Sequence, residues 1–264
     1  MTAASAAVAV VIGAVSAAIN SVAGGGSLVS FPVLRVGFHM PSVDANMTNT
    51  SSLWPGSLAG GLGYSNLLSK AVHHLKVLLL PTLLGSVIGA WLLTVTSPKL
   101  FDVLVPILIL FAAGLLAFQP RIKVWAGRKR KGVPPAVGFV LQFLVSVYGG
   151  YFGAGMGIMM LAAFSLYVEG DIHEYNAIKN WLGLLINLIA TLVFLIPGHV
   201  AADGRRPPHI DWSIAVPMIV GSVIGGYWMA RVSQRIDSEK LRVLIAIYGF
   251  VAAAYFVYQL AVGG

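Results

Sequence analysis

The chain has 264 residues, of which 58% are hydrophobic and only 10% are charged. A soluble globular protein carries about 25% charged residues, so this chain lacks the polar groups that would cover a water-facing surface. Composition therefore predicts an integral membrane protein, which the helix-length segments described next make all-α, and excludes disordered chains and nucleic-acid modules. The absence of cysteine excludes disulfides and cysteine-ligated metals. The formal net charge of +8 comes from basic residues that lie almost entirely between the apolar segments.

Eight stretches of the chain lack Asp, Glu, Lys and Arg. Six have the length of one membrane-spanning helix, which needs about 20 apolar residues: residues 45–69, 77–98, 103–120, 180–202, 212–230 and 243–264. The other two, residues 1–34 and 132–168, are 34 and 37 residues long and contain a glycine cluster near the middle. We interpret each as a hairpin of two short helices that reverses at the glycines, because glycine weakens helices and permits sharp turns. Length alone leaves open whether these hairpins span the membrane or re-enter it.

The two hairpins belong to an internal repeat. The segment Gly85-Ser86-Val87-Ile88-Gly89 recurs 136 positions later as Gly221-Ser222-Val223-Ile224-Gly225. Further upstream, an offset of 130 pairs the two glycine clusters and also pairs Asn46 with Asn176. We predict two repeats, residues 1–120 and 133–264, joined by a basic connector at residues 121–132. Each repeat would hold one hairpin and three helices, about 8–10 membrane segments in total, and an odd number of passages would invert the second repeat.

The basic residues predict which loops face the cytoplasm, because cytoplasmic loops carry an excess of Lys and Arg. Six lie in the connector: Arg121, Lys123, Arg128, Lys129, Arg130 and Lys131. With a cytoplasmic connector, tracing the helices outward places twelve of the seventeen Lys and Arg residues on the cytoplasmic side. Both termini are then extracytoplasmic. The acidic loop at residues 169–174 is the exception to this pattern.

Two sets of residues are candidates for binding a solute. The first is the pair of glycine clusters: Gly24, Gly25 and Gly26 with the neighbouring Ser27, and Gly153, Gly155 and Gly157. A broken membrane helix exposes backbone N–H groups, and the positive N-terminus of the helix that follows favours an anion. Close helix packing is the alternative, because small residues often serve that purpose in membranes.

The second set consists of polar residues in otherwise apolar segments. Their spacing of i, i+3 and i+4 places them on one helix face in each repeat: Asn46, Asn49 and Thr50 in the first, and Asn176, Lys179 and Asn180 in the second. Helix capping is the alternative for Asn46 and Asn176, because Asp44 and Glu174 mark polar helix starts close by. Capping does not account for the later members of each set.

Lys179 follows Glu174 by five residues and precedes 23 residues without a formal charge. Ionisable residues inside a membrane are candidates for function, and we favour an anion ligand. The alternative is a lysine that snorkels over about 7.5 Å of helix to the interface. The sequence contains no metal-protease or nucleotide-binding motif, so we predict a protein that is not an enzyme and has neither metal nor cofactor.

Together these motifs resemble the TauE/SafE family of sulfite and sulfoacetate exporters. The first half carries Ala23-Gly24-Gly25-Gly26-Ser27, Phe31-Pro32, Asn46-x-Thr48-Asn49, Pro55-Gly56 and Gly85-x-x-x-Gly89, and the second carries Asn176-x-x-Lys179-Asn180 and Gly221-x-x-x-Gly225. The first cluster has three glycines where many members have four, and Ala154 and Met156 interrupt the second. The resemblance implies export of sulfite or an organosulfonate across the inner membrane of a bacterium.

We expect alternating access between the two repeats, with the anion held at the hairpin tips. The expected partners are a small, sulfite-like anion and the lipid bilayer, and no nucleic acid. A homodimer is compatible with so small a transporter. The alternative function is transport of another small solute on the same scaffold: thiosulfate, another anion or a cation. A cation is the less favoured of these, because Lys179 would repel it.

Overall fold

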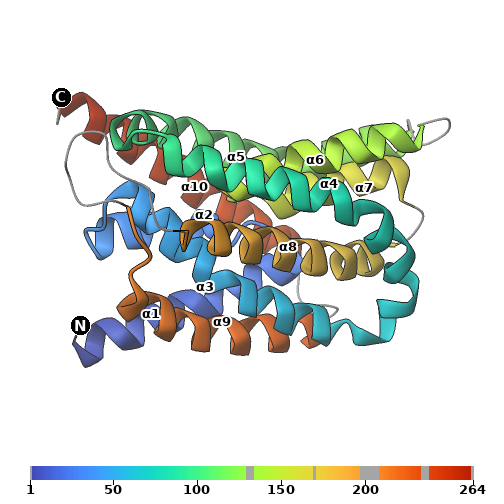
Figure 1. Ribbon diagram of the computed structural model, residues 1–264, viewed down its shortest axis with the longest axis horizontal. Helices are drawn as coiled ribbons and strands as arrows, with labels where there is room; N and C mark the ends of the chain where they lie inside the picture. Colours follow the sequence, from blue (N-terminus) through green and yellow to red (C-terminus); the bar gives the residue numbers. More distant parts are fainter. Residues whose placement is uncertain (1, 129–133, 169–170, 197–207, 233–237, 263–264) are drawn as a thin grey trace.

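The computed structural model describes residues 2–128, 134–168, 171–196, 208–232 and 238–262. Within these ranges the chain is all-helical, as the charge-free segments predict. Among the described residues, six helices are long and apolar enough to cross a membrane: Ala3–Val22, Ala71–Val95, Pro98–Ile122, Ile172–Phe194, Trp212–Val232 and Lys240–Val262. They run roughly along the long axis of the molecule (Figure 1). The protein is therefore a multi-pass membrane protein.

The order of the helices follows the predicted segments. The first half contains α1 (Ala3–Val22), α2 (Ser27–Pro32), the π-helical turn η1 (Val33–Gly37), α3 (Ser42–Gly63), the 3₁₀ turn η2 (Ser65–Leu67), α4 (Leu68–Val95) and α5 (Pro98–Arg128). The second half contains α6 (Pro135–Tyr151), α7 (Met156–Tyr167), α8 (Ile172–Phe194), α9 (Trp212–Val232) and α10 (Ser238–Val262). Each predicted single helix is present, and each glycine-rich segment forms a pair of helices, α1 with α2–η1 and α6 with α7.

The two hairpins are asymmetric, which corrects the expectation of two short arms. The first arm of the first hairpin, α1, has 20 residues and is therefore about 30 Å long, enough to cross the hydrocarbon core. Its second arm, Ser27–Gly37, is only about 16 Å long. In the second hairpin α6 has 17 residues and α7 has 12. The second arm of each hairpin is thus too short to cross the membrane alone.

Helix α3 is polar yet almost completely buried. It packs against α1, α8 and α9, and hydrogen bonds to backbone carbonyls satisfy part of its buried polar surface. Ser52 Oγ donates to Thr48 O over 2.6 Å, and Ser222 Oγ of α9 donates to Ser52 O over 2.8 Å. Its polarity explains why α3 is not among the helices apolar enough to span, although it has 22 residues. With α8 it forms the polar centre of the helix bundle.

The repeated Gly-x-x-x-Gly segment makes the same kind of contact in both halves. A Cβ atom built on Gly89 of α4 would lie 2.0 Å from the carbonyl oxygen of Val147 in α6. A Cβ atom built on Gly225 of α9 would lie 2.0 Å from the carbonyl oxygen of Ala14 in α1. Small residues let membrane helices approach this closely. The glycines therefore hold α4 against α6 and α9 against α1.

The start of α1 and the end of α10 lie toward the same end of the molecule (Figure 1). Helix α5 continues to Arg128, so the first residues of the predicted connector extend that helix. The connector's Lys129, Arg130 and Lys131 lie outside the described residues. Which end of the molecule faces the cytoplasm therefore stays a prediction from the basic residues.

Candidate functional site

The chain reverses at both glycine clusters because their backbone adopts the left-handed conformation. Gly24 has φ +83°, Gly153 has φ +77° and Gly155 has φ +78°. Residues with a Cβ atom rarely adopt such angles, whereas glycine does so at little cost. Gly24 follows the end of α1, and Gly155 directly precedes α7. The local sequence thus determines both turns.

The two turns lie against each other. A Cβ atom built on Gly24 would come within 2.6 Å of the carbonyl carbon of Gly157. The ring of Phe31 in α2 also packs edge-on against Phe152, which directly follows α6, with centroids 5.3 Å apart. The residues of both turns are buried. Two segments far apart in the sequence therefore meet inside the protein.

A small cavity adjoins the contact between the turns. Residues from α1, α3, α7 and α8 line it together with Gly24: Asn20, Ser57, Met156, Gly157, Met160, Lys179, Asn180 and Gly183. Its volume is about 20 Å³, which holds roughly one water molecule. Four of the residues expected to bind a solute line this cavity: Gly24, Gly157, Lys179 and Asn180.

Lys179 is 3% exposed, and its ammonium group is hydrogen-bonded inside the protein. It donates to the carbonyl oxygens of Asn20 (2.7 Å) and Ser21 (3.0 Å) and to Oδ1 of Asn176 (2.7 Å). The two carbonyls belong to the last turn of α1, which is the negative end of that helix. Lys179 thus reaches across to a different helix and does not snorkel along its own.

Asn46 makes a related contact in the other half. Its Nδ2 donates to the carbonyl oxygen of Tyr151, the last residue of α6, over 2.9 Å. Neither Asn46 nor Asn176 caps its own helix, because α3 begins after Pro41 and α8 after Asp171. The capping alternative is therefore wrong for both. Asn46 bonds to the end of α6, and Asn176 accepts from Lys179 at the end of α1.

The other expected site residues do not line the cavity: Gly25, Gly26, Ser27, Asn46, Asn49, Thr50, Gly153, Gly155 and Asn176. Several of them fix the local structure. Gly26 N donates to Asn20 Oδ1 over 2.7 Å, which closes the first turn. Ser30 Oγ donates to Asn49 Oδ1 over 2.5 Å and ties α2 to α3. Asn180 Nδ2 donates to Asn176 O within α8 over 2.9 Å.

Comparison with known proteins shows the family of the chain. The family model described as sulfite exporter TauE/SafE matches residues 9–256. The chain belongs to the TauE/SafE family. A probable membrane transporter protein of Haemophilus influenzae is 24% identical over 248 residues, which cover 94% of this chain and 92% of the relative. The probable membrane transporter protein YfcA of Escherichia coli K12 is 24% identical over 242 residues, 91% of this chain and 85% of the relative.

A shorter match joins this TauE/SafE chain to the probable membrane transporter protein YunE of Bacillus subtilis. It is 22% identical over 124 residues and covers 47% of this chain and 42% of the relative. No solved structure matches the chain. The family and the relatives identify the protein as a membrane transporter.

Five residues that line the cavity of this TauE/SafE transporter were not predicted from the sequence: Asn20, Ser57, Met156, Met160 and Gly183. Asn20 had a usable signal, since it is a polar residue in an apolar run one helical turn before Gly24. Ser57 directly follows the Pro55-Gly56 pair that carries part of the family resemblance. Met156 lies between Gly155 and Gly157 of the second cluster, and its position there was a signal. Met160 and Gly183 had no such signal, because these residue types are common throughout apolar helices.

Proposed function

We propose that this transporter exports a small sulfur-containing anion, sulfite or an organosulfonate, across the cytoplasmic membrane by alternating access of its two halves. The observation that carries the proposal is the contact of the two glycine turns beside the buried ammonium of Lys179. The start of α7 lines the same cavity through Met156 and Gly157, and a helix N-terminus attracts negative charge. Both features favour an anion, and the sulfur chemistry comes from the family.

The size of the cavity implies a closed state in this mechanism. Sulfite is larger than one water molecule, so a cavity of about 20 Å³ holds it only after the turns separate. Parting Gly24 from Gly157 would open the space between the hairpins. Lys179 would then exchange a carbonyl oxygen of α1 for an oxygen of the anion. Return of the turns to contact would follow release on the other side.

Helix packing supports two inverted halves. Helix α1 packs on α9 as α6 packs on α4, and α3 packs on α9 as α8 packs on α4. In the predicted repeats α1 corresponds to α6, α3 to α8 and α4 to α9. Replacing each helix by its counterpart turns the α1–α9 contact into the α6–α4 contact, and the α3–α9 contact into the α8–α4 contact. In Figure 1, α1 begins at the left of the molecule and α6 at the right, so this pair runs in opposite directions. Halves related in this way can rock about a site between them.

The membrane potential suffices to drive export of such an anion. An anion leaving a cell with a negative interior gains about 2.3 kcal/mol per charge for each 100 mV. The mechanism therefore needs no coupling ion. Transport of a cation is disfavoured, because the Lys179 ammonium would have to lie beside it in a buried cavity.

The proposal is tested by the flux of radiolabelled sulfite from proteoliposomes under an imposed potential of either sign. The wild type should show saturable flux that follows the potential, and Lys179→Ala should lose it. Lys99→Ala is the matched control, because Lys99 is an exposed lysine at the start of α5. This control should keep the flux of the wild type.

Three results would change the proposal. Flux that survives Lys179→Ala would support an exporter but would show that Lys179 does not bind the anion. Absence of sulfite flux with folded wild-type protein would overturn sulfite as substrate. Thiosulfate, organosulfonates and monovalent cations tested in the same vesicles would then identify the class of solute, and flux of a cation alone would overturn the anion site altogether.

A further inference from the structure

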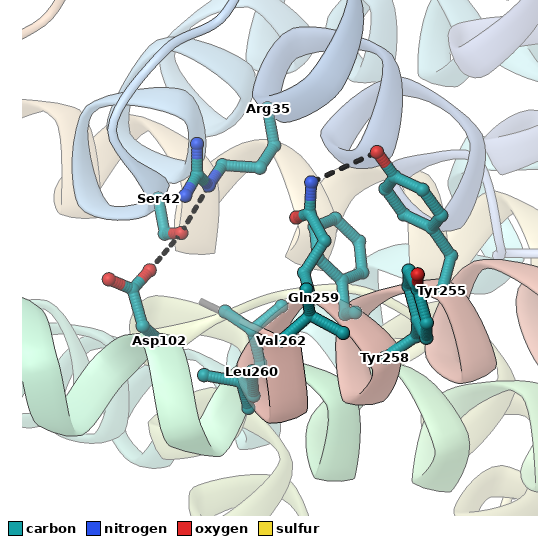
Figure 2. A pocket seen from close by; sticks show the side chains of 10 residues that line it. Arg35, Ser42, Asp102, Tyr255, Tyr258, Gln259, Leu260 and Val262 are labelled. Carbon is teal, nitrogen blue, oxygen red and sulfur yellow. Dashed lines mark hydrogen bonds between the residues drawn. The ribbon is translucent and has the colours of Figure 1, made fainter. Parts of the chain in front are cut away.

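A second, larger pocket lies away from the glycine turns, at the end of the molecule where α10 ends. Its volume is about 540 Å³. Residues of η1, α3, α5 and α10 line it (Figure 2), and none of them lines the cavity beside Lys179. Its polar side chains include Arg35, Ser42, Asp102, Tyr255 and Gln259. The transport mechanism proposed above uses none of these residues.

One wall of this pocket carries two opposite charges. Arg35 Nε donates to Ser42 Oγ over 2.8 Å, and Arg35 Nη1 donates to Met40 O over 3.1 Å. Ser42 Oγ in turn donates to Oδ1 of Asp102. Ser42 therefore holds the guanidinium and the carboxylate on either side of its hydroxyl group (Figure 2). A guanidinium has five N–H donors, so these two bonds leave donors for a ligand.

The opposite wall is formed by the last turns of α10. Gln259 Nε2 donates to the hydroxyl oxygen of Tyr255 over 2.9 Å. Tyr255 accepts this bond, so its own O–H is left to donate to a ligand. Figure 2 shows Gln259 between Arg35 and Tyr255. A phosphate group on this side would meet a guanidinium and a hydroxyl, while an ammonium group beside Asp102 would meet a carboxylate.

An apolar groove of about 380 Å³ adjoins the pocket. Tyr255 and Phe256 line both of them. The groove runs between the second arm of the first hairpin and α10, and its other lining residues are Pro32, Val33, Val36, Gly37, Tyr248, Val251 and Ala252. The residues of α10 that line the groove run from Tyr248 to Phe256 and span about 12 Å, somewhat less than half of a hydrocarbon core of ~30 Å. Since α10 is long and apolar enough to span, the groove is long enough to hold most of an acyl chain of one leaflet.

We propose that the pocket and the groove together bind one phospholipid with an amine headgroup, such as phosphatidylethanolamine. An acyl chain lies in the groove beside Val36, the phosphate lies near Arg35 and Tyr255, and the ammonium lies near Asp102. Arg35 and Asp102 together favour a zwitterionic headgroup, which carries both an anionic phosphate and a cationic amine. The headgroup of an anionic lipid has no cation to pair with the Asp102 carboxylate. The bound lipid would hold η1 against α10.

The test is native mass spectrometry of the detergent-purified full-length protein, titrated with phosphatidylethanolamine or phosphatidylglycerol of identical acyl chains. The wild type should retain phosphatidylethanolamine over phosphatidylglycerol by about threefold, the scale of a partly exposed charge pair. Asp102→Asn keeps an acceptor for Ser42 but removes the charge, and it should abolish this preference. Val36→Trp should fill the groove and reduce retention of both lipids. Val216→Trp, on the exposed face of α9, is the control and should behave as the wild type does.

Two outcomes would overturn the proposal. One is equal retention of the two lipids, or a preference for phosphatidylglycerol, in the wild type. This comparison needs no substitution and so does not depend on the folding of any variant. The other is a preference for phosphatidylethanolamine that persists in Asp102→Asn, which would place the selective site elsewhere.

Discussion

The backbone of Gly24 rests directly against the backbone of Gly157. A Cβ atom built on Gly157 would lie 2.7 Å from the Cα atom of Gly24, although real Cβ atoms essentially never come closer than 3.0 Å to another heavy atom. The contact exists because both residues lack a side chain. The Cβ atom built on Gly157 would also lie 3.2 Å from Cδ of Lys179. The side chain of this buried lysine therefore lies beside the contact between the two hairpins.

Gly157→Ala should force the two turns apart. We expect the free energy of unfolding to fall by about 1–3 kcal/mol, the usual cost of overpacking a core, and anion flux to fall with it. Gly114→Ala is the control, because a Cβ atom there would meet nothing within 4 Å. That substitution should be neutral or stabilise α5 by up to about 1 kcal/mol. Thermal unfolding and flux measured on both variants test this, and equal effects would show that the contact is not required.

Gly155→Ala should be more damaging than Gly153→Ala. Both residues have left-handed backbone angles, so each alanine carries strain of about 1–3 kcal/mol. An added Cβ atom on Gly155 would also lie 3.0 Å from the Cβ atom of Ala112 in α5, whereas one on Gly153 would meet only the carbonyl oxygen of Gly149, at 3.0 Å. The melting temperatures of the two variants, measured in the same detergent, show which substitution destabilises the protein more. A lower melting temperature for Gly153→Ala would contradict it.

Lys179→Met should destabilise the protein as well as impair transport. The substitution preserves much of the side-chain volume but leaves the carbonyls of Asn20 and Ser21 without the ammonium donor. An unsatisfied buried acceptor costs about 1–3 kcal/mol. Lys99→Met, at an exposed site on α5, should leave the melting temperature unchanged. Identical melting temperatures for Lys179→Met and the wild type would mean that the ammonium does not stabilise the end of α1.

Asn46→Asp should be worse than Asn46→Ala. The buried amide donates to Tyr151 O, and a carboxylate would replace this donor with an acceptor that faces the negative end of α6. Alanine removes the hydrogen bond without adding repulsion. Asn66→Asp changes the same chemical group at an exposed position and should have little effect. The yield of folded monodisperse protein and its melting temperature measure the order, and equal values for the two Asn46 variants would refute it.

Gly225→Ala should disrupt the packing of α9 on α1. The new Cβ atom would lie 2.0 Å from the carbonyl oxygen of Ala14, and neither backbone can move without shifting a whole helix. We expect a loss of stability toward the upper end of about 1–3 kcal/mol, measured by thermal unfolding. The effect should exceed that of Gly114→Ala, and a stability equal to that control would show that α9 does not pack this closely.

Much of the fold could be predicted because helix formation in a membrane depends on local composition. Residues 103–120 and 212–230 carry no charge over the length of one crossing, and α5 and α9 occupy these stretches. The reversal at Gly24 was equally local, since a left-handed residue in an apolar run is best supplied by glycine. The arm lengths of the hairpins were predictable only in part. The short second arm agrees with the sequence, since Arg35 ends the charge-free run. The full-length first arm α1 does not follow from its own residues, because what it packs against, chiefly α9, lies far along the chain.

The sequence by itself determined that this chain is a membrane protein with two glycine breaks and two polar helix faces, because charge, hydropathy and backbone freedom are properties of neighbouring residues. Only the tertiary structure decided what those features contact. Lys179 bonds to Asn20 across 159 positions of chain, and Asn46 bonds to Tyr151 across 105. Such partners are chosen by which helices pack together, through glycine contacts at several places at once, and no single segment carries that information.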